Sequence, residues 1–189
     1  MSRHCSSSAL ILAGGKATRL GGIPKHEIVV GRRTIFDRQV AVIAPRVAEI
    51  LVATAHDIAG YRCVRDVVPD VGPLAGIAAG LAAMHTDWLL VIAGDMPHLT
   101  GEVIDELVDA AAGDGVGVRV GGLVEPLVSV LHKAVLPVVT RRLGDGRYKV
   151  ADLFADLRVR WLDLDRHKQA FSNVNEPEDL GRLTGSKPA

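Results

Sequence analysis

Short apolar runs alternate with amphipathic segments over the first two thirds of the chain. Residues 8–13 (SALILA) form a compact apolar run, which is typical of a buried strand. By contrast, Ile35, Phe36, Val40 and Ile43 fall on one stripe of a helix. A strand followed by a helix occurs three times in succession, which predicts an α/β fold with a mostly parallel sheet flanked by helices.

Turn and capping residues set the expected limits of these elements. Pro73 suits the first turn of one helix, Thr100 is placed to cap another, and Gly121–Gly122 joins two strands. The predicted strands are residues 8–13, 49–55, 63–68, 87–95, two strands within 116–132, and 159–164. The predicted helices are residues 34–44, 73–85, 100–113, 150–157 and a last one that begins within 173–183.

Length and composition favour one globular unit. The chain has 189 residues, of which 48% are hydrophobic, so we expect one domain over residues 1–189 with only the last few residues loose. Its longest apolar stretches fall well short of the ~20 residues that span a bilayer. The apolar core of the N-terminal stretch is too short for a signal peptide, which predicts a cytoplasmic protein. Cys5 and Cys63 have no metal or redox spacing.

The formal net charge is zero, but the charges are segregated along the chain. Residues 1–65 carry ten Lys or Arg against four Asp or Glu, whereas residues 66–115 carry nine acids and no Lys or Arg. This pattern argues against a nucleic-acid binder, which would have a continuous basic face. It is compatible with two halves of a site for an anion and a cation, although most of the acids are explained by solvent-exposed helix faces.

Two segments predicted at strand ends carry the candidate chemistry. Residues 14–25 combine four glycines with Lys16, Arg19 and Lys25, a composition that suits a triphosphate because glycine N–H groups approach anions closely. The segment does not fit GxxxxGK[ST] or GxGxxG, and a glycine-rich turn is often purely structural. Asp95 ends the most apolar strand, where a carboxylate is placed to hold Mg²⁺; capping of the next helix is the simpler alternative.

Five motifs in order resemble the molybdenum cofactor guanylyltransferase family of the NTP-transferase superfamily. They are LAGGKATRLGGIPK at 12–25, GPLAGI at 72–77, GDMP at 94–97, EPLVSVLH at 125–132, which is similar to the family's central strand, and FSNVNEPEDL at 171–180. The resemblance implies a single Rossmann-like nucleotidyltransferase domain. It also implies transfer of GMP from GTP to the molybdopterin cofactor, with release of pyrophosphate and with Mg²⁺ as the cofactor.

Residue roles follow from the resemblance. Lys25, Arg19 and Asp95 are implied to be catalytic, with Asp95 as the Mg²⁺ ligand, and Asp70 is implied to lie near the guanine. The nucleotide-binding residues would be Leu12, Ala13, Gly14, Gly15, Lys16, Lys25, Asp70, Gly76 and Asp95. Asn173 and Arg147 are candidates for contact with the acceptor. Helix capping is sufficient to explain Asn175, so Asn173 is the better functional candidate of the two, whereas surface solvation explains Arg147 at least as well. Molybdoenzymes and cofactor-delivery proteins are the implied partners, with no membrane involved.

Two positions bear on nucleotide choice and on activity. Gly14 matches the guanylyl form of the loop, because the cytidylyl relatives read LAAG where this chain has LAGG. Pro24 stands where the family usually has Asp, so any contact made by that carboxylate is missing. The alternatives left open are a cytidylyltransferase, another NTP transferase of the same fold, and a non-catalytic binder of nucleotide or cofactor.

Overall fold

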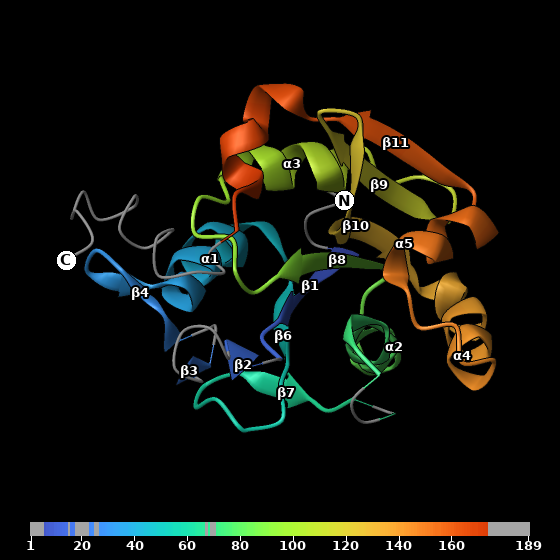
Figure 1. The fold of residues 1–189 in the computed structure, drawn as a ribbon, viewed down its shortest axis with the longest axis horizontal. Helices are drawn as coiled ribbons and strands as arrows, with labels where there is room; N and C mark the ends of the chain where they lie inside the picture. The colour runs from blue at the N-terminus through green and yellow to red at the C-terminus, as the bar shows by residue number, and fades with distance from the viewer. Residues whose placement is uncertain are drawn as a thin grey trace.

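The fold was analysed in a computed structural model, which describes residues 6–14, 16–17, 23–24, 27–66, 68 and 71–173. A seven-stranded sheet runs through its centre in the order β11-β9-β10-β8-β1-β6-β7 (Figure 1). Six of these strands point the same way and only β10 is antiparallel to its neighbours. The strands are β1 (Ser7–Leu12), β6 (Glu49–Ala53), β7 (Arg62–Val64), β8 (Trp88–Ala93), β9 (Gly115–Val120), β10 (Leu123–His132) and β11 (Val159–Asp163).

Helices cover both faces of the sheet, which confirms the predicted α/β architecture (Figure 1). One face packs against α1, α3 and the 3₁₀ segment η7, and the other packs against α2, α4 and α5. The helices are α1 (Ile35–Ile43), α2 (Pro73–Ala83), α3 (Gly101–Asp109), α4 (Leu136–Gly144) and α5 (Val150–Leu153). The 3₁₀ segments are η4 (Ala44–Arg46), η5 (Lys133–Val135), η6 (Phe154–Asp156) and η7 (Asp165–Phe171).

The two hydrophobic layers follow from the alternation of side chains along the central strands. In β1, Leu10 faces the layer of α2 and α4, whereas Ala9 and Ile11 face the layer of α1 and α3. All three are fully buried, as are the middle residues of β8. A strand that is buried on both faces is apolar along most of its length, which is why the sequence shows these strands as apolar runs without alternation.

Several elements differ from their predicted form. Helix α4 was not predicted at all, and β7 ends at Val64, well before the expected limit at residue 68. Thr100 is the N-cap residue of α3, but its side chain makes no capping hydrogen bond. The strand at EPLVSVLH is not central, because β8 and not β10 occupies the middle of the sheet. The predicted last helix lies outside the described residues, apart from Asn173.

Two short hairpins between β1 and α1 were also not predicted. They pair β2 (Lys16–Ala17) with β3 (Ile23–Pro24), and β4 (Val29–Val30) with β5 (Arg33–Thr34). The second hairpin leads straight into α1, where Thr34 and Asp37 form a capping box. No helix in the described part of the chain is long and apolar enough to cross a membrane.

Candidate functional site

A cavity of about 420 Å³ opens where β1, β6 and β8 end. These three strands are parallel neighbours in the sheet, so their carboxyl ends meet at one edge. In open α/β sheets, ligands bind outside the carboxyl ends of the strands, so the position of this cavity is that of a ligand site. Its lining residues are Leu12, Gly14, Ala53, Asp66, Gly72, Pro73, Gly76, Ala93, Gly94, Asp95 and Leu127.

Asp95 lies in the wall of the cavity directly after β8, and only 8% of its surface is exposed. The preceding residue, Gly94, brings the chain against the end of β1, where its N–H donates to the carbonyl of Leu12 at 3.1 Å. A Cβ on Gly94 would lie 2.6 Å from that carbonyl oxygen, so only glycine permits this approach. The close contact between the ends of two strands therefore positions the carboxylate of Asp95.

Gln39 of α1 holds the segment that carries Asp95 by hydrogen bonds to its backbone. Its side chain is 1% exposed, and its Nε2 donates to the carbonyl oxygens of Ala93 at 2.7 Å and Met96 at 3.4 Å. These carbonyls lie on either side of Asp95 in the chain, so Gln39 fixes the loop that carries the carboxylate. Sequence analysis missed Gln39, because the expected apolar stripe of this helix ran through Val40, which is only half-buried. Its position four residues after the buried Ile35 was the available signal.

The N-terminal end of α2 forms a second wall of the cavity. Pro73 is the first residue of this helix. Gly72 precedes it as the N-cap residue with a positive φ of 90°, and as a glycine it has no side chain that could cap the helix. Gly76 lets the helix approach the sheet, since a Cβ there would lie 3.0 Å from the Cβ of Ala53 and 3.3 Å from a Cδ of Leu12. Pro73 has no N–H and the N–H of Ala75 donates to the carbonyl of Gly72 at 3.2 Å, but no side chain caps this turn, so the helix dipole favours an anionic ligand at this end.

Asp66 is the acid that sequence analysis missed. It lines the cavity, and its Oδ1 lies 3.3 Å from where a Cβ on Gly76 would be. It follows β7 by two residues, just as Asp95 follows β8 by two, so it also belongs to the edge where parallel strands end. The signal in the sequence was therefore an acid just after the end of a strand. It was not recognised because the predicted strand 63–68 included Asp66. Asp70, the acid chosen from the sequence, lies outside the described residues.

The structure brings four of the predicted site residues together at the cavity. They are Leu12, Gly14, Gly76 and Asp95. Ala13 is buried beside them, and its N–H donates to the carbonyl of Ala53 at 3.0 Å, which ties the start of the glycine loop to β6. The predictions for Gly15, Arg19, Lys25 and Asp70 lie outside the described residues, and Lys16 is described only by its backbone in β2.

The two acceptor candidates do not line this cavity. Arg147 is exposed in the loop before α5, and its Nη1 lies 3.6 Å from a carboxylate oxygen of Asp156. That carboxylate is also bound by Arg142 at 2.6 Å, and this hydrogen bond holds the pKa of Asp156 below its usual range. Asn173 is exposed beyond η7. In β10, burial raises the pKa of the Glu125 carboxyl, two residues before the lining residue Leu127.

The carboxylates that line the cavity suit a hard cation whose other ligands are mainly oxygen atoms of the substrate. The described residues contain no group of three His, Cys, Asp or Glu side chains that could enclose a metal ion. Mg²⁺ does not need such a group, because it keeps several waters and typically binds one or two protein carboxylates together with substrate phosphates. The buried carboxylate of Asp95, in the wall of a cavity that is also lined by the start of α2, fits this mode of binding.

Comparison with known proteins gives a consistent result. The family described as MobA-like NTP transferase domain matches residues 9–161. A molybdenum cofactor guanylyltransferase from Pseudomonas putida is 33% identical over 92% of this chain and 95% of its own. One of the same name from Vibrio campbellii is 28% identical over 97% of each chain.

The fold has close counterparts among solved structures. Molybdopterin-guanine dinucleotide biosynthesis protein A from Archaeoglobus fulgidus superposes with a TM-score of 0.79, over 94% of this chain and 97% of its own, at 22% identity. A nucleotidyl transferase from a Methanothermobacter species gives a TM-score of 0.73 at 21% identity, over 95% of this chain and 96% of its own. The mostly parallel sheet and its two helical layers are thus those of solved nucleotidyltransferases.

Proposed function

This chain belongs to the family of MobA-like NTP transferase domains, and we propose that it transfers GMP from GTP to the molybdopterin cofactor. The observation that carries the proposal is the buried Asp95 carboxylate in a cavity at the carboxyl ends of three parallel strands. A cavity of about 420 Å³ lies within the ~300–1,000 Å³ typical of small-molecule sites, and Gly14, the first residue of the glycine-rich segment, lines it.

In the proposed complex, the nucleotide base lies against the backbone of residues 12–14 and below the first turn of α2. The carboxylate of Asp66 accepts hydrogen bonds from the N1–H and N2 amino groups of guanine, a donor pair that cytosine lacks. Gly14 leaves space for the base, since a Cβ there would have no contact closer than 3.8 Å within the described protein. We assign to Asp66 the contact with guanine that the family resemblance implied for Asp70, which lies outside the described residues, because Asp66 lines the cavity.

The proposed reaction is an in-line displacement at the α-phosphorus of GTP. An oxygen of the terminal phosphate of molybdopterin forms the new bond, the bond to the bridging oxygen of the β-phosphate breaks, and pyrophosphate leaves with the electron pair. The attacking phosphate is already ionised, so no general base is needed. Positioning and charge neutralisation therefore supply the catalysis, and we assign the neutralisation to Lys25, Arg19 and the N-terminal end of α2.

Asp95 is the proposed ligand of Mg²⁺ in this reaction. When bound there, the ion would neutralise charge on the phosphates and on the departing pyrophosphate. Asp95 itself contributes a fixed negative charge whose position is set by Gly94 and Gln39. Asn173 and Arg147 remain our proposed contacts for the acceptor, with Arg147 exchanging its weak pair with Asp156 for the acceptor phosphate. The recipients of the product would be molybdoenzymes or their delivery proteins.

Asp95→Asn tests the proposal most directly. The substitution keeps the shape of the side chain but removes its charge, so pyrophosphate release from GTP, Mg²⁺ and molybdopterin should be abolished. Asp163→Asn is a matched control, because Asp163 also ends a parallel strand but is exposed on β11, outside the cavity. Full turnover by Asp95→Asn would exclude Asp95 as the metal ligand.

Thermal unfolding with nucleotide separates the alternative activities. A ligand at one hundred times its dissociation constant adds about 2.7 kcal/mol of stability, which is readily seen as a raised melting temperature. We expect GTP with Mg²⁺ to raise it more than CTP does, and Asp95→Asn to reduce the difference. Equal or greater stabilisation by CTP would indicate a cytidylyltransferase. Stabilisation by nucleotide without any pyrophosphate release would indicate a non-catalytic binding protein.

A further inference from the structure

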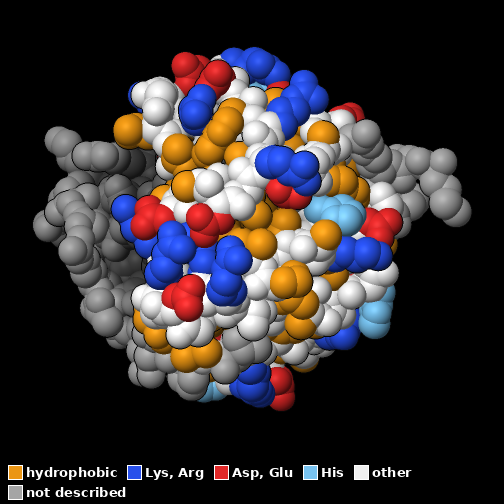
Figure 2. Space-filling model, turned by 90° about the vertical axis from the view of Figure 1, so that its right-hand side faces the viewer, with side chains coloured by type: hydrophobic (Ala, Val, Ile, Leu, Met, Phe, Trp, Pro, Cys, Tyr) orange, Lys and Arg blue, Asp and Glu red, His pale blue; other side chains and the backbone are white. Residues whose placement is uncertain are grey.

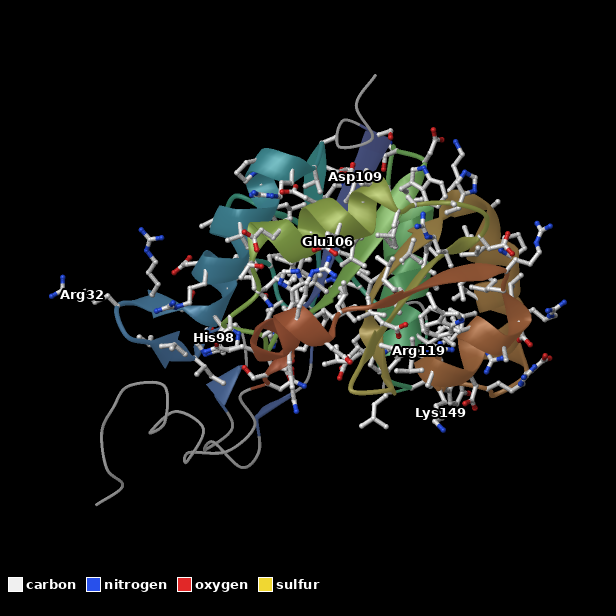
Figure 3. The ribbon with its side chains drawn as sticks, turned by 90° about the horizontal axis from the view of Figure 1, so that it is seen from above. Arg32, His98, Glu106, Asp109, Arg119 and Lys149 are labelled. Atoms are coloured by element: carbon white, nitrogen blue, oxygen red, sulfur yellow. The ribbon has the colours of Figure 1, made fainter. Side chains whose placement is uncertain are left out.

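A second cavity, of about 410 Å³, lies between the β4–β5 hairpin, α1 and the loop that follows β8. It is lined on its basic side by Arg32, Arg33 and Arg38, and we call it the arginine groove. Its floor is apolar and includes Val42, Pro97, Leu99 and Ala41. Figure 3 shows Arg32 extending outward from the hairpin into solvent. No carboxylate of the described residues lines the groove.

Most basic side chains on the rest of the described surface pair with a carboxylate, whereas the three arginines of the groove, like Arg119, Arg141, Arg160 and Lys168, do not. None of them forms an ion pair with a carboxylate in the described part of the chain. On the opposite face, over α4 and α5, Lys and Arg side chains lie beside Asp and Glu side chains (Figure 2). The Lys and Arg pairs among the described residues are Arg46–Asp105, Arg62–Glu49, Arg65–Asp57, Lys133–Asp87, Arg142–Asp156, Arg147–Asp156, Lys149–Asp152, Arg158–Asp114 and Arg166–Glu106.

Arg38 is held in place without an acidic partner. Its Nε and Nη2 donate to the carbonyl oxygen of Val30, at 3.2 Å and 2.5 Å. Gly31, at φ 70° in the hairpin turn, leaves space for this contact, because a Cβ there would lie 3.2 Å from Nη2 of Arg38. A guanidinium carries five N–H donors, so a fixed cation with unused donors remains at the edge of the groove.

The composition of the groove favours a polypeptide over a compact anion. Phosphate typically binds where several backbone N–H groups converge, as at a free helix N-terminus. The N-terminus of α1 beside the groove is already capped, because Thr34 Oγ1 accepts from the N–H of Asp37 and the Asp37 carboxylate accepts from the N–H of Thr34. Separate guanidinium groups around an apolar floor instead match carboxylates that alternate with apolar side chains. Arginine is also enriched at protein interfaces.

We propose that the arginine groove is a docking site for an acidic segment of a partner protein, in which Glu or Asp residues flank an apolar side chain. The apolar side chain would lie on Ala41 and Val42, the accessible apolar residues of the lining, and the carboxylates would pair with Arg32 and Arg33. Pro97 and Leu99 belong to the loop that carries Asp95, so the partner would dock beside the catalytic edge of the sheet. The docking site is independent of which nucleotide the enzyme uses.

Fluorescence anisotropy with a defined probe tests this site. The probe is a fluorescein-labelled peptide in which Glu and Leu alternate, and its counterpart has Gln in place of every Glu. We expect the full-length protein to bind the Glu peptide and not the Gln peptide. Arg32→Glu with Arg33→Glu should weaken this binding by at least about tenfold, because two attractive contacts become repulsive. Arg32→Gln with Arg33→Gln, which places no acid in the groove, should give a smaller loss.

The matched control reverses two charges elsewhere. Arg141→Glu with Arg160→Glu changes the net charge by the same amount at exposed positions on α4 and β11, away from the groove. This control should bind the peptide like the natural sequence. Stabilisation by GTP, measured on all variants, should not change, so failure of the docking proposal can be distinguished from failure of the proposed activity.

Four results would overturn the proposal. The first is that the Glu peptide does not bind, and the second is that the groove and control variants weaken its binding equally. The third is that inorganic phosphate displaces the peptide completely while chloride at equal ionic strength does not. The fourth is that the peptide binds more tightly after the chain's own C-terminal acids are neutralised. The third would indicate a site for compact anions. The fourth, tested with Glu176→Gln, Glu178→Gln and Asp179→Asn combined, would make that segment of the chain itself the occupant.

Discussion

At the end of β8, the backbone of Gly94 lies so close to β1 that a Cβ would be 2.6 Å from the carbonyl oxygen of Leu12. At the end of β1, in the same cavity, a Cβ on Gly14 would have only the carbonyl oxygen of Ala53 within 4 Å among the described residues, at 3.8 Å. Both glycines line the cavity and both lie in glycine motifs at strand ends. The protein's own packing requires glycine at position 94, whereas at position 14 it leaves room for a side chain.

This difference separates two uses of glycine in one site. The end of β8 is a rigid support, in which the contact of Gly94 with Leu12 and the hydrogen bonds from Gln39 fix Asp95. The end of β1 is a surface whose unfilled space is available to a ligand. Substitutions at the first should therefore act on the fold and on catalysis, and substitutions at the second should act on nucleotide choice alone.

Gly94→Ala should have the largest effect on stability. The added methyl group would meet backbone atoms, which have no rotamer to change, so the ends of β1 and β8 must separate. Overpacking of this kind costs ~1–3 kcal/mol, and a contact with fixed backbone belongs at or above the upper end of this range. For a chain of this length, a loss of about 3 kcal/mol corresponds to a melting temperature lower by roughly 6–12 °C. Thermal unfolding followed by circular dichroism measures it.

Gly144→Ala is the control for Gly94→Ala. Gly144 ends α4, and a Cβ there would have no atom of the described residues within 4 Å apart from the backbone of its own helix. We expect this variant to melt near the natural protein. If Gly94→Ala and Gly144→Ala melted at the same temperature, the close contact between β1 and β8 would not be a constraint on the fold.

Gln39→Leu should have an intermediate effect on stability and a marked effect on turnover. The substitution leaves the carbonyl oxygens of Ala93 and Met96 without the donor that the Gln39 side chain provides, and loss of a buried partner costs ~1–3 kcal/mol. Because Gln39 contacts the loop and not the cavity, we expect kcat for pyrophosphate release to fall more than the affinity for GTP. The Mg²⁺ concentration at half-maximal rate should rise, since Asp95 would lose its fixed position.

Gln169→Leu provides a matched control, because Gln169 is the only other glutamine in the chain and is exposed in η7. It should leave both kcat and the Mg²⁺ dependence unchanged. A Gln39→Leu enzyme that lost stability but kept the natural kcat and Mg²⁺ dependence would show that Gln39 supports the fold without positioning Asp95.

Sequence patterns predicted the long strand that carries Asp95 better than the other residues and contacts of the site. Asp95 was found because β8 is apolar along its length and ends at a recognisable motif. Asp66 was missed because β7 has only three residues and its first two positions are not buried, so the end of the strand left no hydrophobic boundary. The close approach of Gly94 to Leu12 has no local signal, because the two residues are far apart in the chain and meet only in the folded sheet.

The missed helix α4 has a similar cause. Arg142 occupies one of its buried positions, with 1% of its surface exposed, and is paired with Asp156 at 2.6 Å. A charged residue on the buried face interrupts the apolar stripe that would otherwise have identified the helix. Gln39 interrupts the stripe of α1 in the same way. In both helices, the buried polar side chain reaches a specific partner that only the tertiary structure supplies.

Gly14→Ala should have the smallest effect on stability and the most specific effect on binding. The backbone φ of Gly14 is outside the left-handed region and the added methyl group has space, so we expect a change between about 0 and +1 kcal/mol, from reduced freedom of the unfolded chain. If the base lies against this segment, the methyl group would crowd it. One methyl group is worth ~1–3 kcal/mol of discrimination, so the preference for GTP over CTP should fall by about tenfold or more.

This preference is measured from the melting temperature at increasing concentrations of GTP or of CTP, in the natural protein and in Gly14→Ala. Gly144→Ala is the control, because it adds the same methyl group away from the cavity. A Gly14→Ala protein that kept both its stability and its GTP preference would place the base elsewhere in the cavity and leave Asp66 to account for selectivity. A protein that lost stability without nucleotide would show instead that the space beside Gly14 is needed by the fold, and the contrast between the two strand ends would disappear.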